Sequence, residues 1–129
     1  MTVARPRLYQ RAVDLALRAR SGDSALQAAR AWRQALPLSR EANRYVLQIL
    51  IGMNRLAETA EPLKREITNA EAKERAIAIA SIPRLFARAS DKKGAAQVVE
   101  QALAEYLITP ALGVAAWTTI GRMRMEAGD

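Results

Sequence analysis

The chain has 129 residues, a formal net charge of +7, and neither cysteine nor histidine. These absences exclude disulfide bonds and thiolate chemistry, and they remove the commonest general base and the commonest metal ligand. Only six residues are aromatic, and alanine supplies much of the apolar share, which favours close-packed helices over a sheet. We therefore expect one all-α domain over residues 1–129, with no catalytic residue, cofactor or metal site.

Four helices are expected in the first half of the chain. Gly22 is expected to take a positive φ and end the first helix, and Asp23 or Ser24 to cap the second. Pro37 ends the second helix, and Pro62 predicts either a kink in the fourth helix or a later start. Apolar residues recur at steps of three and four over residues 8–19, 25–36, 39–51 and 56–67.

The second half predicts three more helices. Two helical stretches, over residues 70–92 and 95–107, are separated by Asp91–Gly94, which is expected to break the helix. Pro83 predicts a bend or a split within the first stretch. Thr109–Pro110 is typical of the N-cap and first residue of a last helix, which runs to the end of the chain. The short connections predict about seven helices packed as antiparallel neighbours.

Several features recur at an interval of 34 residues. Gly94 and Gly128 are 34 positions apart, and each follows a helical segment. In the same register Phe86-Ala87 matches Ile120-Gly121, and Gly22-Asp23 returns in kind as Gly128-Asp129. An interval of this size indicates stacked helical hairpins.

These residues resemble the tetratricopeptide repeat (TPR), a 34-residue helix–turn–helix unit. Arg124 stands where the family usually has a tyrosine, and Lys64 where it has an aromatic residue. The resemblance covers about three and a half units and implies a right-handed superhelix of antiparallel hairpins. The matching positions are Trp117, Ile120, Gly121, Gly128 and Asp129 for the first helix of the repeat, and Ala28, Trp32, Ala35 and Pro37 for the second.

Packing in such a unit sets small residues beside large ones. We expect Trp32 and Trp117 to lie in the core, where they fill the space left by the small residues. Because the chain stops where a fourth unit should turn into its second helix, we expect a fragment of a longer array. The last helix would then leave Trp117, Ile120 or Met123 partly uncovered and favour self-association; a natural capping helix is the alternative. The small residues are Ala16, Ala28, Ala35, Ala87 and Gly121.

The resemblance also implies a concave surface lined by one face of each first helix. Arginine pairs with a carboxylate through two parallel hydrogen bonds, so a groove rich in arginine suits an acidic peptide or a free C-terminal carboxylate. The groove is similar only in charge to the carboxylate clamp of chaperone-binding TPR proteins, and Asn43 is expected to face elsewhere. The candidate partner-binding residues are Arg44, Tyr45, Gln48, Arg84, Arg88 and Arg122, with Lys92, Thr118 and Met125 on the same faces.

Two other charged clusters carry weaker hypotheses. Glu58, Glu61 and Glu66 are expected on an exposed, charged helix face rather than at a catalytic centre. A basic stripe of Arg7, Arg11 and Arg18 could contact the phosphates of nucleic acid. That function is less favoured, because exposed aromatic residues are scarce and acidic residues are mixed with the basic ones.

The sequence thus predicts a non-enzymatic scaffold that binds a partner protein through a basic groove. The alternatives are a regulatory domain of a larger enzyme, an envelope adaptor similar to TPR lipoproteins of Gram-negative bacteria, and nucleic-acid binding. No apolar run approaches the roughly 18 residues of a membrane span, and the first residues lack the apolar stretch of a signal peptide. The compartment, cytoplasm or periplasm, stays open.

Overall fold

The computed structural model describes residues 6–128, and all regular secondary structure in that range is helical, with no strand. The all-α prediction is therefore confirmed. Asp129, which belongs to the predicted repeat, lies outside the described residues. The helices are α1 (Pro6–Arg18), α2 (Gly22–Ala35), α3 (Arg40–Gly52), α4 (Ala60–Thr68), α5 (Arg75–Ala80), α6 (Ile82–Leu85), α7 (Lys92–Leu103) and α8 (Gly113–Glu126), with 3-10 turns η1 (Leu56–Thr59), η2 (Ala72–Glu74) and η3 (Ala104–Tyr106).

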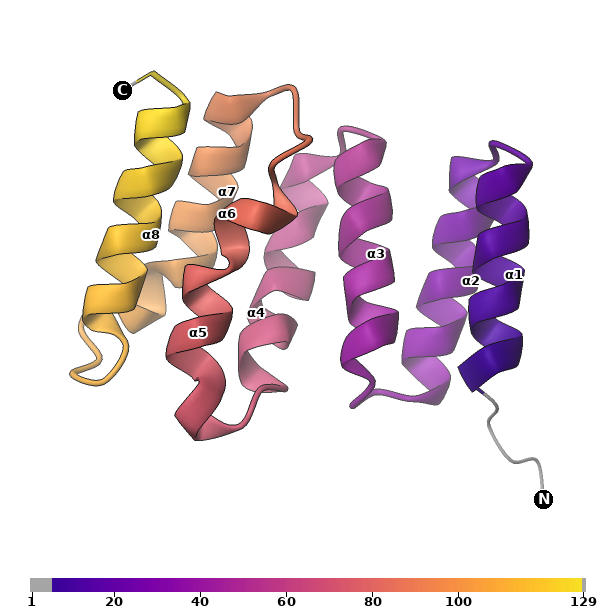
Figure 1. Ribbon diagram of the computed structural model, residues 1–129, viewed down its shortest axis with the longest axis horizontal. Coiled ribbons are helices and arrows are strands. Elements are labelled where there is room, and N and C mark those ends of the chain that lie inside the picture. Colours follow the sequence, from indigo (N-terminus) through magenta and orange to yellow (C-terminus); the bar gives the residue numbers. More distant parts are fainter. Residues whose placement is uncertain (1–5, 129) are drawn as a thin grey trace.

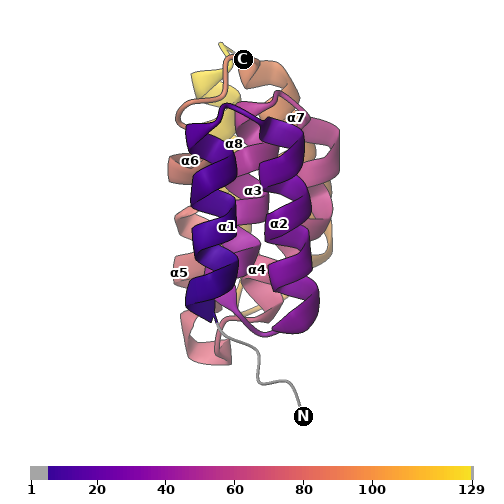
Figure 2. The same ribbon diagram turned by 90° about the vertical axis from the view of Figure 1, so that its right-hand side faces the viewer.

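The helices stand side by side in a row that begins with α1 and ends with α8 (Figure 1). Along the row, α2 packs between α1 and α3, and α7 packs between α4 and α8. The view along the row shows α1, α5 and α6 on one side and α2 and α7 on the other (Figure 2). The row therefore has two sides and two ends.

Helix α3 holds the two parts of the core together. Val46 and Leu50 belong to an apolar cluster with α1 and α2, in which Trp32 is the largest side chain. Leu47 and Ile51 belong to a second cluster that continues through α4, α5 and α7 to α8. Because buried apolar residues occupy two sides of α3, neighbouring helices cover this helix on both of those sides.

The prolines act as expected. The chain after α3 passes through the 3-10 turn η1, and α4 begins at Ala60, so Pro62 marks a later start rather than a kink. The helical stretch around Pro83 is split at Ser81 into α5 and α6. This split gives eight α-helices in residues 6–128, where about seven were predicted.

The turn between α1 and α2 differs from the prediction. Arg20, not Gly22, takes the left-handed conformation, with φ of 57°. The amide of Arg20 donates to the carbonyl of Leu17 and that of Ser21 to Ala16, each at 3.0 Å, which closes α1. Gly22 is the first residue of α2, and Ser21 precedes it without a side-chain cap. The capping role predicted for Asp23 or Ser24 is therefore wrong.

Two other helix starts also differ. Asp91 caps α7, because its side chain accepts a hydrogen bond of 2.9 Å from the amide of Gly94, so this glycine lies in the first helical turn instead of breaking the helix. Thr109–Pro110 does not start the last helix. The carbonyl of Thr109 accepts a hydrogen bond of 2.7 Å from the amide of Gly113, where α8 begins.

The two tryptophans differ in burial. Trp32 is fully buried, as predicted, whereas Trp117 is 59% exposed, so its predicted place in the core is wrong. The expectation that the last helix leaves Trp117, Ile120 or Met123 partly uncovered holds for Trp117, whereas Ile120 and Met123 are buried at 2% and 3% exposure. The reason is the rotation of α8: α5, α6 and α7 cover the side that carries Ile120 and Met123, and no helix of residues 6–128 covers the side that carries Trp117.

The small residues do not all serve close packing. Ala16 and Ala28 are partly buried against the first cluster, in agreement with their predicted role. Ala35 and Ala87 are exposed, and a Cβ added to Gly121 would meet nothing within 4 Å. The prediction for these three positions is therefore wrong within the described residues.

Candidate functional site

One stripe of α3 lines a hollow on the described part of the chain. Five residues of this stripe follow each other at helical steps and so share a face of α3: Glu41, Arg44, Tyr45, Gln48 and Gly52. All five line a cavity of about 690 Å³, a volume within the range of about 300–1,000 Å³ that is common for ligand pockets. We call this hollow the α3 cavity.

Apolar side chains form the inner wall of the α3 cavity. Leu17 enters it from α1, and Ile49 and Met53 from α3 and its end. The ring of Tyr45 packs against Trp32, with centroids 5.4 Å apart. Its hydroxyl accepts a hydrogen bond from Gln10 and donates one to Asp14, so the ring is held on the α1 side.

The rim of the α3 cavity is positively charged. Arg20, Arg44 and Arg88 line it, and Glu41 is the one carboxylate among its lining residues. Within the described chain, neither Arg20 nor Arg88 lies in an ion pair with a carboxylate. Both guanidinium groups are therefore available to an incoming anion.

A second hollow continues from Arg44 toward α6. It has a volume of about 400 Å³ and lies between α3 and the pair α5–α6. Arg44 lines both hollows, and Arg84, Ile77 and Ser81 line the second one. We call the second hollow the α6 hollow, and the two together the basic groove.

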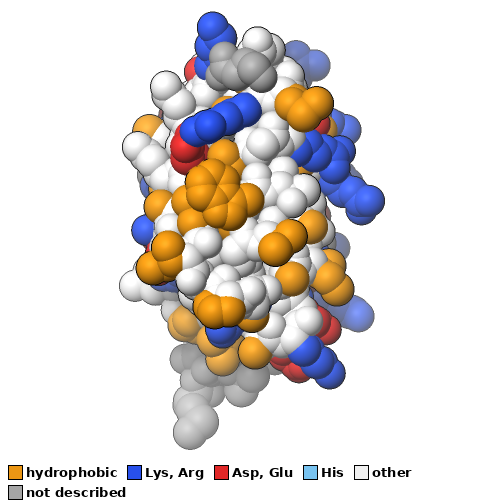
Figure 3. All heavy atoms as spheres, turned by 90° about the vertical axis from the view of Figure 1, so that its left-hand side faces the viewer, with side chains coloured by type: hydrophobic (Ala, Val, Ile, Leu, Met, Phe, Trp, Pro, Cys, Tyr) orange, Lys and Arg blue, Asp and Glu red, His pale blue; other side chains and the backbone are white. Residues whose placement is uncertain are grey.

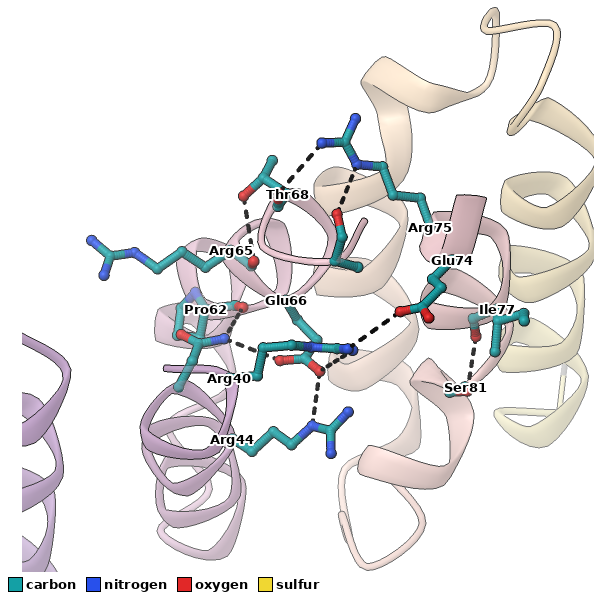
Figure 4. Close-up of polar contacts among 12 residues, drawn as sticks. Arg40, Arg44, Pro62, Arg65, Glu66, Thr68, Glu74, Arg75, Ile77 and Ser81 are labelled. Carbon is teal, nitrogen blue, oxygen red and sulfur yellow. Dashed lines mark hydrogen bonds and ion pairs between the residues drawn. The ribbon is translucent and has the colours of Figure 1, made fainter. Parts of the chain in front are cut away.

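The buried carboxylate of Glu66 lines the α6 hollow and lies between Arg40 and Arg44 (Figure 4). Glu66 is 4% exposed, so the prediction of an exposed face is wrong for this residue, although Glu58 and Glu61 are exposed as expected. Oε1 of Glu66 accepts from Nε of Arg44 at 2.8 Å and from a terminal nitrogen of Arg40 at 3.4 Å. Arg44 is thus partly neutralised by α4, unlike Arg88.

Asn43 completes this network from inside the core. It is fully buried, and its amide nitrogen donates to the carbonyl of Pro62 at 2.8 Å and to Oε2 of Glu66 at 3.4 Å. As predicted, Asn43 faces away from the groove. It supports Glu66, which in turn fixes the position of Arg44.

Of the six predicted partner-binding residues, Arg44, Tyr45, Gln48 and Arg88 line the α3 cavity, and Arg84 lines the α6 hollow. Arg122 lies on α8 outside the lining of both and pairs with Glu126 at 3.4 Å. Lys92 is also outside, because its Nζ donates to the carbonyls of Phe86 and Ala87.

The sequence analysis missed several lining residues of the site, among them Arg20 and Met53. Arg20 reaches the cavity rim because it occupies the left-handed turn position that we had given to Gly22. Met53 lines the cavity from the end of α3, where the sequence indicates only a break. Neither position belongs to a helical stripe, so periodicity alone could not identify them.

The predicted basic stripe on α1 also has a counterpart in space. Arg7, Arg11 and Arg18 line a separate hollow of about 600 Å³ together with Asp14 and Gln10. This hollow lies on α1 alone, so it is an outer helix face rather than a cleft between elements.

Within residues 6–128 no helix combines the length and apolar character that a membrane span requires, and no group of three or more acidic side chains is placed to hold a metal ion. Comparison of the whole chain with known proteins found no matching family model, no similar curated protein and no similar solved structure.

Proposed function

We propose that the protein is a TPR-like interaction scaffold that binds an acidic peptide or helix of a partner protein in the basic groove. The observation that carries the proposal is the convergence of Arg44, Tyr45, Gln48 and Arg88 on one cavity, with Arg84 in the adjoining hollow. Arg122, which lies outside both hollows, is left out of the proposed site.

The helix order supports the TPR-like part of the proposal. In a stack of helical hairpins, alternate helices lie on the same side, and each packs on its neighbours. Here α1, α5 and α6 share a side opposite α2 and α7, and the groove residues come from α3 and α6 (Figure 2). Right-handed superhelical winding is part of the proposal.

Charge and shape support an acidic partner. The chain carries a net charge of +7, which attracts anionic surfaces and speeds their association. The guanidinium groups of Arg84 and Arg88 lie in no ion pair within the described residues, so a partner's carboxylates would not have to displace one. A purely basic surface would lack the apolar wall that Tyr45 and Met53 supply.

Peptide selection tests the proposal. Random peptides displayed on phage are selected on the immobilised protein, and the enriched peptides are labelled and measured by fluorescence anisotropy. We expect enrichment of acidic peptides, with affinity falling at least about tenfold in Arg84→Glu/Arg88→Glu. Arg7→Glu/Arg11→Glu makes the same change of net charge on α1 and should lower the affinity much less.

Equal losses in the two double variants would show that net charge alone drives binding and would overturn the groove. Failure to enrich any acidic peptide would overturn the proposed function itself. Nucleic-acid binding predicts instead that RNA competes for the protein with a steep salt dependence, and that the α1 variant loses the most.

Self-association through α8 is a second candidate contact, favoured by the composition of its outer face. One exposed, uncharged stripe runs along α8 at helical spacing and consists of Val114, Trp117, Thr118, Gly121 and Met125. Figure 3 shows hydrophobic side chains gathered on this end of the molecule, with charged residues around them. In an antiparallel pair of α8 helices, Trp117 of one copy would lie over the open position at Gly121 of the other.

A further inference from the structure

We infer that the α3 cavity is an anchor subsite, which takes one large apolar side chain of an acidic peptide while Arg20 and Arg88 bind carboxylates of the same segment. This inference rests on the proposed function and makes it specific. It assigns a role to Arg20 and Met53, and it states which side chain the partner must carry.

The walls of the cavity fit an apolar side chain better than a second charge. Leu17, Ile49 and Met53 present aliphatic or thioether surface to it. Methionine adapts its shape to different apolar groups because its side chain is unbranched and flexible. Burying a large apolar side chain here would contribute about 1.5–3 kcal/mol, or roughly tenfold to a hundredfold in affinity.

The aromatic part of the lining is already ordered. The Tyr45 ring packs on the buried Trp32, and its hydroxyl is engaged by Gln10 and Asp14. Because the ring is already fixed, packing a peptide side chain on it costs the protein little further conformational entropy. This is the basis of preorganised binding.

The rim selects the charge of the flanking residues. Arg20 comes from the α1–α2 turn, Arg44 from α3 and Arg88 from the segment after α6, so cations from three parts of the chain meet at one opening. Glu66 already holds Arg44 at 2.8 Å. We therefore expect Arg20 and Arg88 to contribute more than Arg44 to carboxylate binding.

Gly52 offers a way to close the cavity without disturbing the core. It lines the cavity at the end of α3, its φ is not in the left-handed region, and a Cβ added there would meet nothing within 4 Å. Gly52→Leu should place a side chain at the cavity while raising helix propensity. Ala31 is exposed on α2 and lies outside the lining of both hollows, so Ala31→Leu is a matched control.

The experiment combines these variants with peptide pairs. Acidic peptides selected on the wild-type protein are synthesised with their central large apolar residue intact or replaced by serine. Each is titrated by fluorescence anisotropy against wild type, Gly52→Leu, Ala31→Leu and Arg20→Ala/Arg88→Ala. We expect serine to weaken wild-type binding at least about tenfold, and Gly52→Leu to remove most of the difference between the two peptides.

The outcomes separate this inference from the proposed function. Acidic peptides that bind at Arg84 and Arg88 but without a preferred apolar position would overturn the anchor and leave the scaffold proposal standing. Equal effects of Gly52→Leu and Ala31→Leu would also overturn the anchor and leave the scaffold proposal standing. If no acidic peptide binds the wild-type protein at all, both proposals fail. Circular dichroism and thermal melts confirm that each variant is folded before its affinity is compared.

Discussion

The two ends of the helical row differ in the chemistry of their outer faces. Helix α1 has leucines exposed at positions 8 and 15, but arginines and Asp14 stand between them and line the same hollow. Helix α8 exposes Val114, Trp117 and Met125 along a stripe without a charge. Both helices pack on one side only within residues 6–128.

This difference shows that the solvent-exposed face of an end helix can have either of two compositions, mixed charged and apolar as in α1 or uncharged as in α8. Charged residues that alternate with apolar ones keep α1 hydrated and oppose stacking of a further apolar surface. The charged residues beside the α8 stripe are already paired within the chain, Arg122 with Glu126 and Arg124 with Glu100. The α8 end is therefore suited to contact with another surface, and the α1 end to solvent.

The largest effect should come from comparing the two tryptophans. Trp32→Ala removes a fully buried side chain from the α1–α2–α3 cluster and should destabilise the fold by about 3–5 kcal/mol. Trp117→Ala removes a side chain that is 59% exposed and should change the stability of the monomer by no more than about 0.5 kcal/mol. Urea denaturation followed by circular dichroism measures both.

Trp32→Phe is the control for the first variant, because it keeps an aromatic ring beside Tyr45 and should lose less than alanine does. Equal destabilisation by Trp32→Ala and Trp117→Ala at low protein concentration would contradict the assignment of α8 as an end helix.

Self-association should also depend on which end is changed. Met125→Glu places a charge in the α8 stripe and should raise the dissociation constant of self-association at least about tenfold, because an unpaired charge is costly to bury. Leu15→Glu makes a similar change on α1 and should leave self-association unchanged. Sedimentation velocity over a range of concentrations compares them. A wild-type protein that stays monomeric at high concentration would rule out the α8 contact.

A smaller effect is expected from two neighbouring threonines of α8. Thr119 is buried and donates a hydrogen bond of 3.2 Å to the carbonyl of Ile79 in α5, whereas Thr118 points to the exposed stripe. Thr119→Val should cost about 1 kcal/mol, and Thr118→Val should cost nothing or stabilise slightly. The same urea titration at low concentration measures both, and a reversed order would place α8 in a different rotation.

The sequence predicted the helices well because their apolar residues recur at helical steps and prolines separate them. It predicted Trp32 correctly, and this side chain lies in the cluster that α2 forms with α1 and α3. It failed for Trp117, since α8 carries apolar residues on all sides and periodicity cannot tell which side a neighbour covers. The burial of Glu66 also escaped prediction, because it depends on Arg40 and Arg44 from another helix.

The residues of the candidate site also fall into some that the sequence could predict and some that it could not. Arg44, Tyr45 and Gln48 were predictable because they follow one face of one helix. Arg88 could be predicted only by assuming a repeat, and it lines the same cavity as these three residues. Arg122 did not join them, since its place depended on how α8 is rotated. Arg20 depends on a left-handed turn residue that is not glycine, for which the sequence carries no clear signal.

The smallest effect concerns two exposed arginine–glutamate pairs, one at the α8 end of the row and one in its middle. A hydrogen bond from Arg124 of α8 lowers the pKa of Glu100 in α7, and hydrogen bonding to Arg55 lowers the pKa of Glu58 in η1. A lowered pKa in the folded state stabilises the fold above the unfolded value of about 4.3, and this contribution is lost as the pH falls through the folded pKa.

Glu100→Gln should therefore lower Tm at pH 7, by less than about 2 °C because the pair is exposed and screened. The difference from wild type should vanish in acid, below the lowered pKa of Glu100, where this carboxyl is protonated in the folded and the unfolded state alike. Thermal melts across this range measure it, with Glu58→Gln as the matched variant; a difference that persists in acid would show that shape rather than charge makes the contribution.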